Sequence, residues 1–277
     1  MKRISAELHW PDSWKSSYEY DLQEIYGQVS NHGYCYAYDN RRRYTLELLT
    51  EVLPPLARIL DVGAAQGNFS LQLAEMGFDV TWNDLRGELA DYVRLKQERG
   101  TLRFVSGNAF ELCFPQPFDA VLITEIIEHV AHPDSFLCKV AELVRPGGYI
   151  VMTTPNGAYF RNKLPRFSDC PDPSVFEAVQ FKPDADGHIF LLHTDEVMEF
   201  AAKADLKVDR LELFTNSLTN GHVKLNPALR LLPRSLVERI EVFTRGLPGA
   251  VAARLLAHMA VRLRKPLELE DALPHAP

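Results

Sequence analysis

Three side chains that could do chemistry stand close together in the stretch TEIIEHV: Glu125, Glu128 and His129. Positions three and four residues apart lie on one face of a helical turn, so the pattern predicts that these side chains point the same way. The imidazole could act as a general base, or the three groups could form part of a shell for Mg²⁺ or Mn²⁺, or for Zn²⁺ with one more ligand. A structural histidine, satisfied by a backbone carbonyl, is the third reading. The residues alone leave all three open.

A second stretch, LDVGAAQG, places Asp61 just before Gly63 and ends at another glycine, Gly67. In a doubly wound sheet, glycines in the turn after the first strand let the backbone approach a ligand. A dinucleotide motif would hold a pyrophosphate there, which the carboxylate of Asp61 would repel. The pattern therefore favours a ligand with positive charge and hydroxyl groups. An ordinary glycine turn is the alternative.

Polar residues also follow the next two apolar runs. FDVTWND ends at Asp84, whose carboxylate could accept hydrogen bonds from two ribose hydroxyls. RFVSG is followed by Asn108 and Ala109, which offer an amide side chain and a backbone N–H to an adenine edge. For Asp84 the alternative is a solvated loop aspartate.

These residues must be positioned by the elements around them. The runs ARILDV, FDVTWND, RFVSG, FDAVLIT and YIVMTTP have the length of buried strands, and residues 133–144 between two of them have helical spacing. Residues 194–204 and KVDRLELFT predict a further helix and strand. The alternation predicts an α/β fold, Rossmann-like and doubly wound, with a mostly parallel sheet and helices on both faces.

Composition divides the chain into three regions. Residues 1–55 are rich in aromatic and polar residues and predict a helical N-terminal lead or lid, and residues 56–220 carry the predicted sheet, with a proline-rich inserted loop at 157–187. Residues 221–277 are predominantly basic, and their segments ALRLLPRSLVERIEVF and AVAARLLAHMAVRLRK predict a helical C-terminal appendage. Basic amphipathic helices can make peripheral contact with an anionic membrane, or pack on their own domain or a second subunit. Both readings stay open.

The overall composition excludes several classes of protein. The chain has 277 residues, 46% of them hydrophobic, and a formal net charge of -7, which disfavours a general grip on nucleic acid. Its four cysteines contain no C-x-x-C pair, so neither a zinc knuckle nor a disulfide scaffold is expected. No signal peptide and no run of about 18 apolar residues is present. We expect a cytoplasmic protein, in solution or at a membrane surface.

The motifs LDVGAAQG, the Asp84 strand tip, GNA, FDAVLITEIIEHV and LVRPGGYIVMTTPN, in this order, resemble those of class I S-adenosylmethionine-dependent methyltransferases. The resemblance covers about residues 57–156, with a weaker tail to 215. It implies that residues 56–220 form the S-adenosylmethionine-binding methyltransferase domain. It also implies a set of cofactor contacts: Asp61, Gly63, Ala65 and Gly67 around the methionine part, Asp84 at the ribose, and Asn108 with Ala109 at the adenine.

Two residues depart from the family pattern. Ala65 stands where many members have glycine, and Asn108 stands where many have aspartate. Alanine is small enough for the turn, and asparagine can still accept a hydrogen bond. We therefore expect binding to survive both changes.

The E-x-x-E-H pattern is similar to that of ubiquinone-pathway O-methyltransferases and small-RNA 2′-O-methyltransferases, where it is associated with a divalent metal. The resemblance implies that His188 joins Glu125, Glu128 and His129 as the fourth ligand of Mg²⁺ or Mn²⁺, with His193 in reserve. A metal-free reaction with His129 as general base is the alternative.

The expected activity is methyl transfer to a hydroxyl oxygen of a small-molecule, glycan or lipid-linked acceptor. The insertion and the aromatic residues of the lead are expected to cover the acceptor: Trp10, Trp14, Tyr34, Tyr36 and Tyr38. Three other functions stay open: an RNA 2′-O-methyltransferase, disfavoured by the acidic charge; a protein that binds the cofactor without transfer; and an NAD-dependent dehydrogenase.

Overall fold

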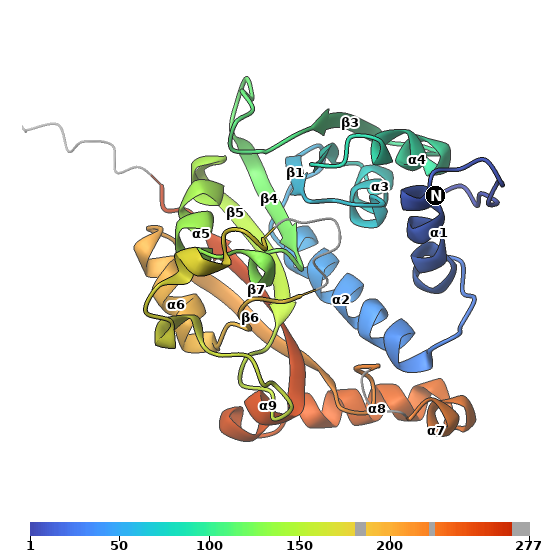
Figure 1. Cartoon of the computed structure of the whole chain (residues 1–277), viewed down its shortest axis with the longest axis vertical. Helices are drawn as coiled ribbons and strands as arrows, with labels where there is room; N and C mark the ends of the chain where they lie inside the picture. Colours follow the sequence, from blue (N-terminus) through green and yellow to red (C-terminus); the bar gives the residue numbers. More distant parts are fainter. Residues whose placement is uncertain (181–186, 222–224, 268–277) are drawn as a thin grey trace, which may run out of the picture.

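The computed structural model describes residues 1–180, 187–221 and 225–267 (Figure 1). Seven strands form one sheet in the order β3-β2-β1-β4-β5-β7-β6. Their bounds are β1 Arg58–Val62, β2 Asp79–Asp84, β3 Thr101–Ser106, β4 Phe118–Thr124, β5 Val144–Pro155, β6 Lys207–Asn216 and β7 Leu256–Arg264. Strands β1 to β5 are mutually parallel, and β7 runs antiparallel between β5 and β6. The predicted α/β fold with a mostly parallel sheet is confirmed.

Helices cover both faces of this sheet. Their bounds are α1 Asp12–Glu24, α2 His32–Thr50, α3 Asn68–Glu75, α4 Leu89–Lys96, α5 Pro133–Glu142, α6 Thr194–Lys203, α7 Asn226–Leu231, α8 Arg234–Arg245 and α9 Gly249–Leu255. Apolar side chains of α2 and α3 pack together on one face, and those of α5 and α6 form a second core on the opposite face. The helices predicted at 133–144 and 194–204 are therefore present, each ending one or two residues early.

The N-terminal lead is helical, and a fully buried ion pair fixes α1 to the core. Lys96 of α4 donates to Asp21 of α1 over 2.7 Å, and both side chains are 0% exposed. The hydroxyl of Tyr92 and the amide of Asn68 also donate to Asp21, at 2.6 and 2.8 Å. Buried charges are tolerated only when they are paired and hydrogen-bonded in this way, so the pair fixes the position of α1 against α4.

The tryptophans of the lead do not cover a cavity, as we had expected them to. Trp10 and Trp14 pack against the ring of Tyr92, with centroids 5.7 Å away in both cases. The Trp10 pair is edge to face and the Trp14 pair is tilted, so both tryptophans help to pack the lead against α4, which carries Tyr92. Tyr34 and Tyr38 of α2, in contrast, line a cavity.

The C-terminal region is only partly the helical appendage that was predicted. Helices α7, α8 and α9 are present, but residues 256–264 form strand β7 inside the sheet. The helix prediction for this stretch was wrong because β7 is buried on both faces, so its mostly apolar residues do not show the alternation that separates a half-exposed strand from a buried helix.

Helix α8 packs on its own domain through one face. Its Val237 is buried, and the buried carboxylate of Glu241 accepts hydrogen bonds from the backbone N–H groups of Thr215 and Asn216 at the end of β6. Val242 and Phe243 of the same helix are exposed. Among the described helices, none combines the length and the apolar character that a membrane crossing requires.

Candidate functional site

The loop after β1 takes the sharp path that its glycines predict. Gly63, Ala65 and Gly67 all have positive φ angles, of 62°, 45° and 71°. A Cβ on Gly63 would lie 2.7 Å from the side chain of Ile126, and one on Gly67 would lie 2.7 Å from Val93. Glycine is therefore required at both positions for backbone conformation and for space. Ala65 adopts the left-handed conformation at a steric cost.

Two carboxylates lie beneath this loop. Asp61 is 1% exposed; its Oδ2 accepts a hydrogen bond of 2.5 Å from Ser70, and its buried Oδ1 has no hydrogen-bond partner among the described residues. Asp84, at the end of β2, accepts hydrogen bonds from the backbone N–H of Ala65 at 2.8 Å and from Arg86. Burial raises the pKa of Asp61 to about 7, an effect that the Ser70 hydroxyl opposes and the charge of Asp84 increases.

Two cavities meet at Gly63 along the carboxyl edge of the parallel strands. The first, of about 270 Å³, is lined mainly by the glycine loop and by residues of α1, α2 and β4: Glu24, Tyr38, Arg41, Gly63, Ala64, Ala65, Gln66, Asn68, Phe69, Arg86, Thr124 and Glu125. The second, of about 580 Å³, lies past the ends of β2 and β3, where Asn108 and Ala109 line it together with Asn83 and Phe136. Glu177 and Gln180 of the insertion close its outer side.

Glu24 and Arg41 of the first cavity are among the lining residues to which sequence reasoning gave no role. The carboxylate of Glu24 accepts hydrogen bonds from Tyr34 at 2.6 Å, from Asn68 at 2.9 Å and from Gln66 at 3.1 Å. Burial raises the pKa of Glu24, although Arg41 opposes the shift. Arg41 stands in a run of three arginines, which is a signal that could have been noticed, whereas nothing in the sequence marks Glu24.

The residues of TEIIEHV do not share one helical face as predicted. Glu125 directly follows β4 and has a positive φ of 53°, and a short 3₁₀ turn begins only at Ile127 and ends at His129. Glu125 instead forms an ion pair of 3.2 Å with Arg41 and accepts a hydrogen bond of 2.9 Å from Thr153. A strained backbone conformation at such a position is typical of functional sites.

The structure brings three of the four predicted metal ligands together. Atoms of Glu128, His129 and His188 that could bind a metal all lie within 4.8 Å of one another. The rings of His129 and His188 meet edge to face, with centroids 4.9 Å apart. Glu125 is outside this group, as is the reserve ligand His193, which lies at the N-terminus of α6.

The two glutamates have opposite electrostatic surroundings. Burial raises the pKa of Glu128 well above its ordinary value, and the neighbouring charge of Glu125 adds to the shift. Burial would also raise the pKa of Glu125, but Arg41 and His258 outweigh it, so the pKa of Glu125 is lowered. Glu128 Oε2 accepts from Thr154 at 3.0 Å, and its buried Oε1 has no hydrogen-bond partner in the described part of the chain. Such a group is suited to receive a cation.

A third cavity, of about 630 Å³, adjoins the first through Tyr38, Arg41 and Glu125, which line both. Its lining comes from α2, the end of β5, the start of the insertion, the segment before α6, and β7: Asn31, Tyr34, Ala37, Tyr38, Arg41, Glu125, Pro155, Asn156, Tyr159, Arg161, Asn162, His188, Leu191, Asn220, Gly221, Ala257 and His258. The structure thus places the predicted insertion at two cavities, while residues 181–186 of it lie outside the described ranges.

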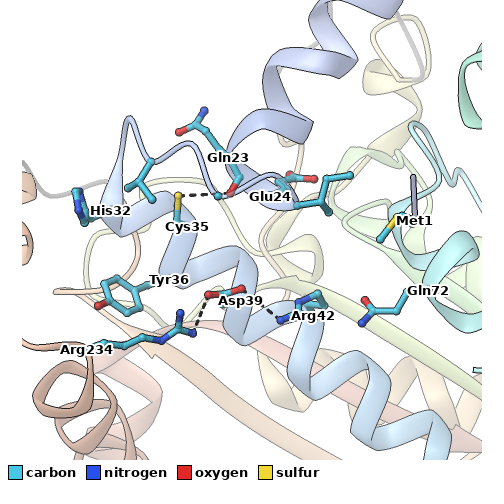
Figure 2. Close-up of a pocket in the computed structure, with 13 residues that line it drawn as sticks. Met1, Gln23, Glu24, His32, Cys35, Tyr36, Asp39, Arg42, Gln72 and Arg234 are labelled. Carbon is cyan, nitrogen blue, oxygen red and sulfur yellow. Dashed lines mark hydrogen bonds and ion pairs between the residues drawn. The ribbon is translucent and has the colours of Figure 1, made fainter. Parts of the chain in front are cut away.

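A fourth cavity, of about 410 Å³, lies on the other side of α2 (Figure 2). Asp39 pairs there with Arg42 and with Arg234 of α8, and the thiol of Cys35 donates to the backbone of Gln23 over 3.7 Å. Among the described residues, this cavity shares only Glu24 with the first cavity. None of the residues that line it belongs to a strand, so it is separate from the chemistry at the strand ends.

Known sequences that resemble this chain are methyltransferases. A family model described as a methyltransferase domain matches residues 36–211. The ubiquinone biosynthesis O-methyltransferase of Xanthomonas campestris pv. campestris is 36% identical over 106 residues, which are 37% of this chain and 44% of that protein. The protein of the same name from Proteus mirabilis is 34% identical over 112 residues, 38% of this chain and 43% of that protein. The chain therefore matches less than half the length of these relatives.

Solved structures share the fold at low sequence identity. The [4+2]-cyclase SpnF superposes with a TM-score of 0.55 and 18% identity, covering 93% of this chain and 97% of that one. The N-methyltransferase NodS from Bradyrhizobium japonicum, in complex with S-adenosyl-L-homocysteine, gives a TM-score of 0.51 at 12% identity, covering 92% of this chain and all of that one. At such identity the likeness concerns the fold alone.

Proposed function

The chain belongs to the methyltransferase-domain family, and from that premise we propose that it transfers the methyl group of S-adenosylmethionine to a hydroxyl oxygen of an acceptor. The observation that carries the proposal is the arrangement of three adjoining cavities along one edge of the sheet. Two of them meet at Gly63, and the third meets the first at Glu125. This geometry suits a long cofactor with its reactive methyl beside a second molecule.

The residues of the first two cavities fit the cofactor. Gly63 and Ala65 line the first cavity and would surround the methionine part, and Asn108 with Ala109 would face the adenine in the larger cavity. Asp61, Gly67 and Asp84 line neither cavity and lie directly behind the loop. From there the unpartnered Oδ1 of Asp61 would suit a cationic group, and Asp84 would hold the ribose once Arg86 moves aside. S-adenosylmethionine supplies the electrophilic methyl group when bound.

The group of Glu128, His129 and His188 fits a divalent metal such as Mg²⁺ or Mn²⁺. One carboxylate oxygen is already buried without a partner, and two imidazoles lie within reach of it. A metal at this position would lower the pKa of an acceptor hydroxyl. Glu125 would join the ligands only by giving up its ion pair with Arg41.

Oxygen as the methylated atom is supported by the relatives, which are named O-methyltransferases. The acceptor class that we propose is a small molecule, a glycan or a lipid-linked compound, because the net charge of -7 disfavours a polyanion such as RNA. Tyr34, Tyr38 and Tyr159 at the third cavity could stack on an aryl or sugar ring.

The test is transfer of radiolabelled methyl groups from S-adenosylmethionine into a fractionated cell extract. We expect label in material that resists nuclease and protease treatment. Label confined to the nuclease-sensitive fraction would indicate an RNA 2′-O-methyltransferase instead. Calorimetric binding of S-adenosylmethionine without labelling of any fraction would indicate a protein that binds the cofactor without transfer, and heat with NAD alone would indicate a dehydrogenase.

A further inference from the structure

Two histidines, His188 and His258, line the third cavity. His129, which the sequence singled out as a base, is not among the described residues that line it, and its Nδ1 lies 3.3 Å from the backbone oxygen of Gly187. A general base must reach the proton that it removes, so position in the cavity decides between the histidines. His188 belongs to the group that suits a metal, which leaves His258 with no role in the reaction described so far.

The position of His258 is fixed by the sheet. It lies on β7, where it pairs with Pro155 of β5 on one side and Phe214 of β6 on the other. Its ring stacks on that of Phe214, with centroids 5.8 Å apart and planes inclined by 22°. The Nδ1 atom is buried, so the ring nitrogen that can meet a molecule in the cavity is Nε2. A ring that a strand and a stacked neighbour hold in place is positioned more precisely for catalysis than a ring on a loop.

The described titratable and charged residues that line this cavity with His258 are Tyr34, Tyr38, Arg41, Glu125, Tyr159, Arg161 and His188. Of these, the carboxylate of Glu125, directly after β4, is the one of opposite charge to an imidazolium. Glu125 lines both the cofactor cavity and the third cavity, and it is near enough to His258 for the two charges to interact. A nearby carboxylate favours the protonated form of an imidazole. Arg41 moderates this attraction through its own ion pair with Glu125.

We propose that His258 is the catalytic base that accepts the proton of the acceptor hydroxyl. The inference rests on the proposed function and deepens it. The hydroxyl proton moves to Nε2 of His258, and the oxygen lone pair forms the new C–O bond while the bond from methyl to sulfur breaks. That electron pair stays on sulfur, which becomes the neutral thioether of S-adenosylhomocysteine. The imidazolium, stabilised by Glu125, then returns its proton to solvent.

The experiment compares His258→Phe and His258→Gln with His129→Ala and the unchanged protein, in the extract fraction that the unchanged protein labels. Phenylalanine keeps the ring stacked on Phe214 but removes both nitrogens, so the fold should persist, as thermal unfolding will show. We expect both His258 variants to bind S-adenosylhomocysteine as before and to lose about 10²–10⁴-fold in turnover. The unchanged protein should lose activity towards acidic pH as its base becomes protonated, and the residual activity of the variants should lack that loss.

The outcomes separate this inference from the function on which it rests. If the unchanged protein labels no fraction, the proposed function fails, and the role of His258 fails with it. If labelling occurs and His258→Phe, folded and able to bind the cofactor product, keeps its rate within about threefold, the function stands and His258 is not the base. If instead His129→Ala no longer loses activity at acidic pH, while the His258 variants still do, then His129 is the catalytic base.

Discussion

Two regions meet at the carboxyl edge of the parallel strands, the cavities proposed for the cofactor and the cavity proposed for the acceptor, and they are built from different kinds of segment. The side proposed for the cofactor is made mainly by loops that directly follow β1, β2 and β3, where its residues stand in short, ordered motifs, with Glu24, Tyr38 and Arg41 added from α1 and α2. The acceptor side is assembled from α2, the insertion and β7, which are far apart in the chain. Tyr38, Arg41 and Glu125 connect the two sides, because they line the cavities of both. The comparison teaches that most residues proposed for the cofactor stand in local motifs, whereas those proposed for the acceptor come from distant segments.

The largest effect should come from removing the metal proposed at Glu128, His129 and His188. We expect EDTA to abolish transfer and Mg²⁺ or Mn²⁺ to restore it. His188→Ala and His129→Ala should each lower turnover by about 10²–10⁴-fold, because without the metal the pKa of the acceptor hydroxyl is no longer lowered. His193→Ala is the matched control, since His193 lies outside the group of ligands. Full activity in EDTA would show that the acceptor side works without a metal.

A smaller effect is expected on the cofactor side from Asp84→Ala. The change removes the proposed ribose contact and the hydrogen bond to the N–H of Ala65. Each hydrogen bond to a charged group contributes about 1.5–3 kcal/mol, so calorimetry should show affinity for S-adenosylmethionine falling about tenfold to a hundredfold. Asp79→Ala, at the opposite end of β2, is the control, because Asp79 only pairs with Arg103 there. Equal losses in both variants would point to damage to β2.

Cofactor affinity should also depend on pH through Asp61. Burial raises the pKa of this carboxyl to about 7, with the Asp84 charge adding to the effect and Ser70 opposing it. A cationic ligand favours the ionised form, so binding below about pH 7 should release a proton, and affinity should rise with pH up to about pH 7, by at most about tenfold per unit, and level off above it. Calorimetry in buffers of different ionisation enthalpy measures the release, which Asp61→Asn should abolish.

The same raised pKa fixes the sign of the effect on stability. The folded protein holds a proton on Asp61 that the unfolded chain gives up, so the ligand-free protein should lose stability as the pH rises from about 4 to about 7. Denaturant unfolding across this range, compared with Asp61→Asn, isolates the contribution of Asp61.

The smallest effect should come from Ala65→Gly. Ala65 has a φ of 45°, a conformation that costs a residue with a Cβ about 1–2 kcal/mol, while glycine gives back part of this through its greater freedom when unfolded. We expect a gain of about 1 kcal/mol in the free energy of unfolding, measured with denaturant. A loss of stability would mean that the Cβ of Ala65 contributes packing that outweighs the strain.

Sequence reasoning reached most of the cofactor side because local periodicity and turn chemistry carry it. The run ending at Asp84 and the helix at Pro133 are defined by neighbours within a few residues, and the structure contains both. The roles assigned to Asp84 and Asn108 remain predictions. Their positions at the strand ends follow directly from the parallel sheet.

The acceptor side could not be derived in the same way. Strand β7 was taken for a helix, so His258 could not be placed opposite Pro155 and near Glu125. The helical turn expected for TEIIEHV begins too late to include Glu125, because Arg41 and Thr153 hold that side chain elsewhere. One signal was available: His258 is the only polar residue in the run LLAHMAV, and a lone titratable group in a buried run needs a reason.

The place of β7 between β5 and β6 also governs how the chain can fold as it leaves the ribosome. Strands β1 to β5 are complete in pairing order once β5 has emerged, so the nascent chain can form the cofactor side early. Strand β6 is made before β7, yet it pairs only with β7 among the described strands. Strand β6 can therefore join the sheet only after β7 has been synthesised, and such non-local pairings generally form late. A nascent chain can therefore assemble the sites proposed for the cofactor before any wall of the acceptor cavity supplied by β7 exists.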